Sequence, residues 1–130
     1  MPYTIELKLG DWSHDGHGIT ESIYISSNIS ASKLRKAYKF GVKIAGFNFS
    51  EIVAQGYEDN KIKKNHAEKL FSLGFDRKSL DYDKTDDVYY VSADSFVDIW
   101  LFICKLGDPN FEFKIKEQKT INIGGYGLFQ

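Results

Sequence analysis

The chain has 130 residues, of which 42% are hydrophobic and 27% charged, and 17 Lys and Arg nearly balance 18 Asp and Glu. This composition is typical of one compact soluble domain, and no run approaches the roughly 18 consecutive apolar residues of a membrane helix. The net charge of -1 argues against a dedicated nucleic-acid binder. Because the N-terminus lacks the pattern of a secretory signal and the single cysteine cannot form an internal disulfide, we expect a cytoplasmic protein.

The N-terminal third of the chain predicts two strands followed by a helix. Apolar and polar residues alternate over 3–9, which indicates a half-buried strand, and 19–26 indicates its partner. The connection between them, 10–18, is far longer than a hairpin turn requires. An apolar stripe at helical spacing follows the capping candidate Ser30 and ends near Gly46.

The helix predicted after Ser30 has two contrasting sides. Phe40, Ile44 and Phe47 widen its apolar face. Its opposite side carries five cations and no acidic residue: Lys33, Arg35, Lys36, Lys39 and Lys43. A solvated lysine-rich face is the favoured interpretation, and phosphate or acidic-protein contacts are the alternative.

The middle of the chain predicts a second helix, a loop and a short strand. Residues 50–55 fit a short helical turn, and Asn60 is a candidate cap for a helix that ends at Gly74. The polar segment 76–87 has mixed charges and no periodicity, so we expect a surface loop. The run 88–91 is rich in β-branched and aromatic residues and predicts a strand.

The last third predicts the central helix and two more strands. A helix capped by Ser92 or Asp94 and ending at Gly107 is apolar all round, which indicates burial on more than one side. Alternation over 111–116 indicates an amphipathic strand, and 120–123 can return antiparallel to it.

The predicted order of elements is β-β-α-α-β-α-β-β. Because strands are paired at both ends and strict β-α alternation is absent, a doubly wound dinucleotide fold is not expected. We expect a single α+β domain over residues 1–130, with a mostly antiparallel sheet and helices packed on it.

The long connection between the first two strands concentrates candidate functional side chains. These are Asp11, Trp12, Ser13, His14, Asp15 and His17. Imidazole and carboxylate groups are common ligands of transition metals, so His14, Asp15 and His17 could hold a divalent transition metal that activates water in a hydrolase. The spacing matches no named metal signature, however, and the third histidine, His66, lies on an apolar helical stripe.

Two further interpretations of the 11–18 loop need no metal. Trp12 could stack against a polar small molecule while the Asp and His side chains orient it. The glycines and polar side chains are also ordinary turn chemistry, so the loop could be purely structural.

The C-terminus is rich in glycine and aromatic residues, with Tyr126 lying between Gly125 and Gly127. It fails as a phosphate loop because no Lys-Ser/Thr pair follows. A tail this apolar is expected either to pack on its own domain or to form an interface.

No motif in the sequence supports nucleophilic or nucleotide-dependent catalysis. Gly-x-Ser-x-Gly, Walker, Gly-x-Gly-x-x-Gly and Cys-x-x-Cys patterns are absent, and Cys104 lies in the most apolar helix, where thiols are usually inert.

The segment Asp-Trp-Ser-x-Asp-Gly-His-Gly at 11–18, with Gly-Tyr-Gly-Leu-Phe at 125–129, resembles a set of small uncharacterised bacterial and phage-borne proteins. The resemblance implies no activity. It favours a shared pocket where the two glycine-rich segments meet.

The function we expect is a non-enzymatic binding protein that needs no cofactor. Its surface would combine the 11–18 loop with Tyr126, and its partner would be a polar small molecule or a protein, as in an immunity or counter-defence protein. The metal-dependent hydrolase is the alternative, and homo-oligomerisation through the apolar tail is a third interpretation.

Overall fold

The computed structural model describes residues 2–11, 20–47, 60–91, 93–118 and 126–129. Its elements confirm the α+β class. In chain order they are β1 (Tyr3–Asp11), β2 (Thr20–Ser27), α1 (Ala31–Ala45), β3 (Asn60–Lys63), α3 (Lys64–Ser72), the 3₁₀ turn η1 (Arg77–Ser79), β4 (Asp81–Asp83), β5 (Val88–Val91), α4 (Ala93–Gly107), β6 (Phe113–Gln118) and β7 (Tyr126–Phe129).

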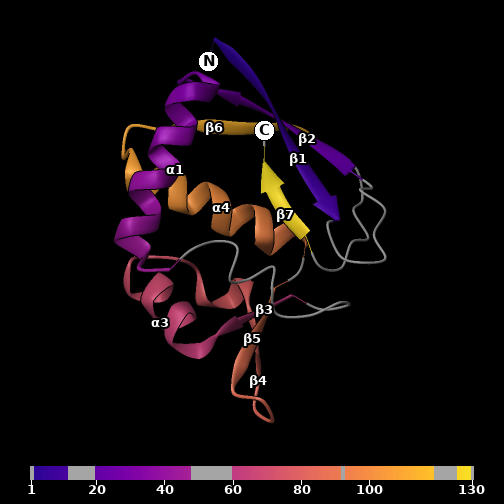
Figure 1. Ribbon diagram of the computed structural model, residues 1–130, viewed down its shortest axis with the longest axis vertical. Helices are drawn as coiled ribbons and strands as arrows, with labels where there is room; N and C mark the ends of the chain where they lie inside the picture. Colours follow the sequence, from indigo (N-terminus) through magenta and orange to yellow (C-terminus); the bar gives the residue numbers. More distant parts are fainter. Residues whose placement is uncertain (1, 12–19, 48–59, 92, 119–125, 130) are drawn as a thin grey trace.

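The strands divide between two antiparallel sheets. The first has the order β6-β2-β1-β7 and the second the order β3-β5-β4. In Figure 1 the four-stranded sheet lies at one end of the molecule and the three-stranded sheet with α3 at the other, while α4 runs between them beside α1.

The four-stranded sheet confirms the alternation predicted for its first two strands. Ile5 pairs with Ile25 and Leu7 with Ile23, and all four side chains are buried. A sheet face of large aliphatic residues stabilises the fold by removing apolar surface from water. Strand β6, predicted over 111–116, pairs with β2 at one edge of the sheet, and the C-terminal segment forms β7, which pairs with β1 at the other edge.

Two predictions for the middle of the chain were wrong. Residues 60–63 form strand β3 rather than the first turn of a helix, and α3 begins at Lys64. Ile62 is buried opposite Tyr89 of β5, so pairing with a neighbouring strand overrides the helical spacing of this segment. The segment 76–87 is not only loop, since it contains η1 and β4, and β4 forms a hairpin with β5.

Helix α4 is the central element of the core, as predicted. Its buried side chains are Ser95, Val97, Ile99, Trp100, Leu101, Ile103 and Cys104. The Trp100 ring stacks on Tyr38 of α1 with centroids 5.5 Å apart. The helix begins at Ala93, so Asp94 lies inside its first turn rather than at the cap.

Helices α1 and α4 pack at backbone contact through two glycines. A Cβ added at Gly41 would lie 1.8 Å from the Ile103 carbonyl oxygen, and one at Gly107 would lie 1.7 Å from that of Ala37. No side chain fits at either place. Glycine is therefore required on each helix at this crossing.

Other predicted features fall outside the described residues: the helical turn at 50–55, the Ser92 cap and the strand at 120–123. Among the helices that are described, none is long and apolar enough to cross a membrane.

Candidate functional site

The structure places two of the predicted site residues opposite each other. Asp11 is the last residue of β1 and Tyr126 the first of β7, and the two are partners in the antiparallel register. The next pair along the ladder is Gly10 with Gly127. The two ends of the chain that carry the candidate motifs therefore meet at one end of the four-stranded sheet (Figure 1).

The remaining predicted site residues lie outside the described ranges. These are Trp12, Ser13, His14, Asp15 and His17. The ligand set of the metal interpretation, His14, Asp15 and His17, is among them.

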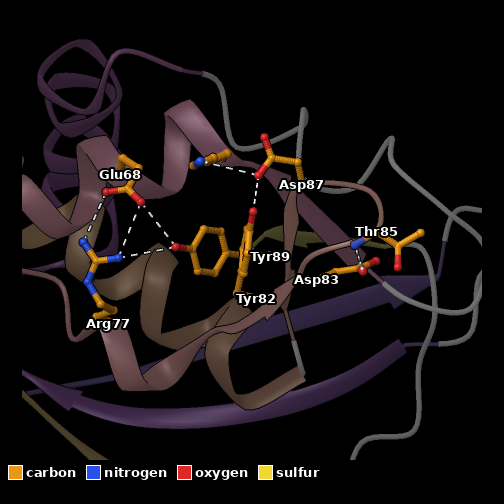
Figure 2. A network of polar contacts seen from close by, with 8 residues as sticks. Glu68, Arg77, Tyr82, Asp83, Thr85, Asp87 and Tyr89 are labelled. Atoms are coloured by element: carbon orange, nitrogen blue, oxygen red, sulfur yellow. Dashed lines mark hydrogen bonds and ion pairs between the residues drawn. The ribbon is translucent and has the colours of Figure 1, made fainter.

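A second group of polar side chains, which the sequence patterns do not predict, joins α3 to the hairpin of β4 and β5. Arg77 of η1 donates to both carboxylate oxygens of Glu68 on α3, at 3.1 and 3.4 Å. The Tyr89 hydroxyl donates to Glu68 at 3.3 Å and accepts from Arg77 at 3.4 Å. As Figure 2 shows, the Tyr89 hydroxyl points at both partners, so the carboxylate, guanidinium and phenol form one connected network.

The hairpin carries two further tyrosine–aspartate pairs. The Tyr82 hydroxyl donates to Asp87, whose carboxylate also lies 3.5 Å from the Lys64 ammonium (Figure 2). The Tyr90 hydroxyl donates to Asp83 at 2.9 Å. Asp87 also has a positive φ of 55°, a conformation that aspartate tolerates better than most residues.

These contacts lower the pKa values of the carboxyl groups in the network and raise the pKa of one phenol. Hydrogen bonds from Arg77, Tyr90 and Tyr82 lower the pKa of the Glu68, Asp83 and Asp87 carboxyls respectively. The hydrogen bond to Asp87 raises the pKa of Tyr82. Carboxylates of lowered pKa are poor proton donors near neutral pH. These three carboxylates are therefore fixed negative charges near neutral pH.

The tyrosines of the polar segment are the part of the sequence that indicates this network, although the polar composition of the segment suggested a loop. Tyr82, Tyr89 and Tyr90 lie in a segment rich in aspartate, and the hairpin brings Tyr82 to Asp87 and Tyr90 to Asp83, while Tyr89 reaches Glu68 on α3. The spacing of these tyrosines and aspartates predicts the contacts only once β4 is known to be a strand.

Other chemistry-bearing side chains of the described residues have structural surroundings. No group of three or more His, Cys, Asp or Glu in these ranges could hold a metal ion. The His66 ring stacks on Phe47 with centroids 4.7 Å apart. Cys104 is fully buried, and this burial raises the pKa of its thiol, which keeps it protonated.

Comparison with known proteins adds no relative: no family model, no curated protein and no solved structure matches the chain. The function must therefore be inferred from its own residues.

Proposed function

We propose that the protein is a small cytoplasmic, non-enzymatic binding protein. Its contact surface combines the 11–18 loop with the start of β7. Trp12 and Tyr126 supply aromatic contacts, and the polar residues of the loop, Asp11, Ser13, His14, Asp15 and His17, orient the polar groups of the partner.

The observation that carries this proposal is the pairing of Asp11 with Tyr126. It joins the two segments that contain the candidate contact residues. Loops anchored on a rigid sheet are common positions for binding residues, because the sheet holds them in place while they vary.

The position of β7 favours a protein over a small molecule as the partner. The strand lies at the edge of its sheet, and within the described ranges its strand neighbour is β1. An edge strand presents backbone N–H and C=O groups that can pair with a strand of another chain. Immunity and counter-defence proteins act in this way: they bind another protein tightly and catalyse no reaction.

Native mass spectrometry of the freshly purified, untagged protein tests the proposal. We expect the wild-type chain to carry a co-purified molecule, a partner or a second copy. Trp12→Ala and Tyr126→Ala should lose that species, whereas Tyr3→Ala, at the far end of β1, should retain it. Equal retention by all three variants would show that binding uses another surface.

Native mass spectrometry, together with an assay of hydrolytic activity, distinguishes the binding proposal from the metal-dependent hydrolase. Zinc or manganese released by His14→Ala or His17→Ala, together with hydrolytic activity lost in those variants, would replace the binding proposal with the hydrolase.

A further inference from the structure

Helix α1 presents a cationic surface. Lys33, Arg35, Lys36, Lys39 and Lys43 project from a helix that has no acidic residue. In the part of the chain that the structure describes, none of these five cations forms an ion pair. By contrast, Lys61 and Lys64, next to the hairpin, lie 3.6 and 3.5 Å from Asp86 and Asp87.

Large apolar side chains are exposed within this cationic surface. Phe40 and Ile44, together with Phe47, widen the apolar face that the sequence predicts for this helix. The structure buries Phe47 but leaves Phe40 59% and Ile44 44% exposed. The two lie one helical turn apart, so they form a short apolar stripe along α1. The Lys43 ammonium lies 5.8 Å from the centre of the Phe40 ring, which places positive charge directly at the stripe.

A pocket of about 200 Å³ adjoins the stripe where α1 meets the end of α4. Its lining residues are Lys33, Lys36, Ala37, Phe40, Gly107 and Asp108. The pocket is smaller than the roughly 300 to 1,000 Å³ of small-molecule sites, so its size suits one inserted side chain. The one carboxylate in the lining, Asp108, already accepts the Asn110 backbone N–H at 3.0 Å.

We propose that this α1 surface, formed by Lys33, Lys36, Phe40, Lys43 and Ile44, docks an acidic protein segment that inserts one apolar side chain beside Phe40. Carboxylates of the segment pair with the lysines that flank the pocket. Opposite charges guide such encounters and select the partner, while a buried aromatic contact supplies most of the affinity. The surface lies on a different element from β7, so it is a second contact site.

The apolar content of the α1 surface favours a protein over the other polyanions. A double-helical nucleic acid presents its phosphates outward and keeps its bases stacked inside, so it offers no apolar group to fill the pocket. An anionic membrane is best bound by a helix with a broad apolar face, but the apolar face of α1 is packed on α4, with Leu34, Ala37, Gly41 and Ala45 buried.

Selection from a display library of short random peptides on the full chain tests the proposal. We expect enriched peptides to combine several Asp or Glu with one large apolar residue. In fluorescence anisotropy, their affinity should fall about tenfold in Phe40→Ala and in the double variant Lys36→Glu/Lys43→Glu. It should also weaken as salt concentration rises.

Matched controls separate the α1 surface from general charge and general exposure. Lys63→Glu/Lys69→Glu makes the same charge change on exposed lysines of β3 and α3, and Ile115→Ala removes an exposed apolar side chain from β6. Both should bind like the wild type. So should Tyr126→Ala, which means that this proposal and the β1–β7 proposal fail independently.

Three results would overturn the docking proposal. One is the absence of any enriched peptide, and another is enrichment of peptides without acidic residues. The third is tighter binding, lost in Lys36→Glu/Lys43→Glu, to a single-stranded oligonucleotide or to phosphatidylserine vesicles, which would assign the surface to nucleic acid or to membrane. Circular dichroism checks that each variant is folded, and we expect the fold to be retained in the lysine, Phe40 and Ile115 variants because these side chains are exposed.

Discussion

The carboxyl of Glu68 shows how one side chain can link the stability of the fold to pH. Its hydrogen bond from Arg77 gives it a folded-state pKa below the ordinary value of 4.5. A carboxyl whose pKa is lowered by folding stabilises the folded state when it is ionised in both states. That contribution is present above pH 4.5 and is lost as the pH falls through the lowered folded-state pKa.

Substitution of Glu68 by Gln therefore has an effect that depends on pH. Near neutral pH we expect Glu68→Gln to unfold at a lower urea concentration than the wild type, and we expect the two midpoints to converge as the pH falls below 4.5. Glu112→Gln, in which the altered group is an exposed carboxyl, serves as the control. A difference between Glu68→Gln and the wild type that stays constant with pH would contradict the role of the Arg77 contact.

Ser30 is a second residue whose contribution can be isolated. Its hydroxyl accepts the Lys33 backbone N–H at 3.4 Å, and its extended backbone conformation is typical of a residue that begins a helix. We expect Ser30→Ala to lower the free energy of unfolding by about 1 kcal/mol, measured by urea denaturation. Ser30→Asp should keep the cap, and Ser32→Ala should have a smaller effect. Equal losses in Ser30→Ala and Ser32→Ala would show that the cap is not the cause.

At the scale of elements, the sequence predicts segments that carry their own periodicity. Helix α1 runs from the predicted cap to the predicted glycine, because its buried residues repeat at helical spacing. Strands β3 and β4 were missed because each is short and polar and is stabilised by its partner β5. The partner of β3 is distant in the chain, so a local pattern cannot reveal that pairing, and the hairpin of β4 with β5 was hidden by the polar composition of 76–87.

The crossing of α1 and α4 depends on two glycines, and this gives a prediction for the element pair. A Cβ at Gly41 would overlap the Ile103 carbonyl, so Gly41→Ala requires the helices to move apart. We expect a loss of about 3 kcal/mol in the free energy of unfolding, since overpacking against backbone has no flexible side chain to relieve it. Gly107→Ala should lower the free energy of unfolding by a similar amount, because a Cβ at Gly107 would overlap the Ala37 carbonyl.

Gly46 provides the matched control for Gly41. A Cβ at Gly46 meets no atom within 4 Å, but its φ of 81° disfavours other residues. Gly46→Ala should therefore cost only about 1 kcal/mol, from backbone conformation alone. Equal losses at Gly41 and Gly46 would show that steric overlap between the helices is not what makes Gly41 necessary.

At the scale of the whole molecule, the fold class was predictable and the arrangement of strands was not. The pairing of β7 with β1 brings residues from opposite ends of the chain together, and it separates β6 from β7. The sequence identified Asp11 and Tyr126 as candidates by residue type. The resemblance implied that the two glycine-rich segments meet, but the strand register that makes Asp11 and Tyr126 partners could not be predicted, because the two strands are distant in sequence and share no local pattern.

Cys104 reports on the opening of the whole molecule. It is the only cysteine and is completely buried in α4, the helix at the centre of the core. A thiol reagent reacts with the thiolate, and burial both shields this group and raises its pKa. Labelling should therefore require the core to open.

We expect Cys104 in the native protein to react with a thiol reagent at least about a thousand-fold more slowly than in urea-unfolded protein. Because Gly41→Ala weakens the packing of α1 on α4, it should increase the native-state labelling rate, whereas Lys39→Ala, an exposed substitution on the same helix, should not. When opening and closing are fast, the labelling rate follows the population of the open form, so the increase should match the loss of stability measured by urea denaturation. Fast labelling of the native wild-type protein would mean that α4 opens locally and that the core does not unfold as one unit.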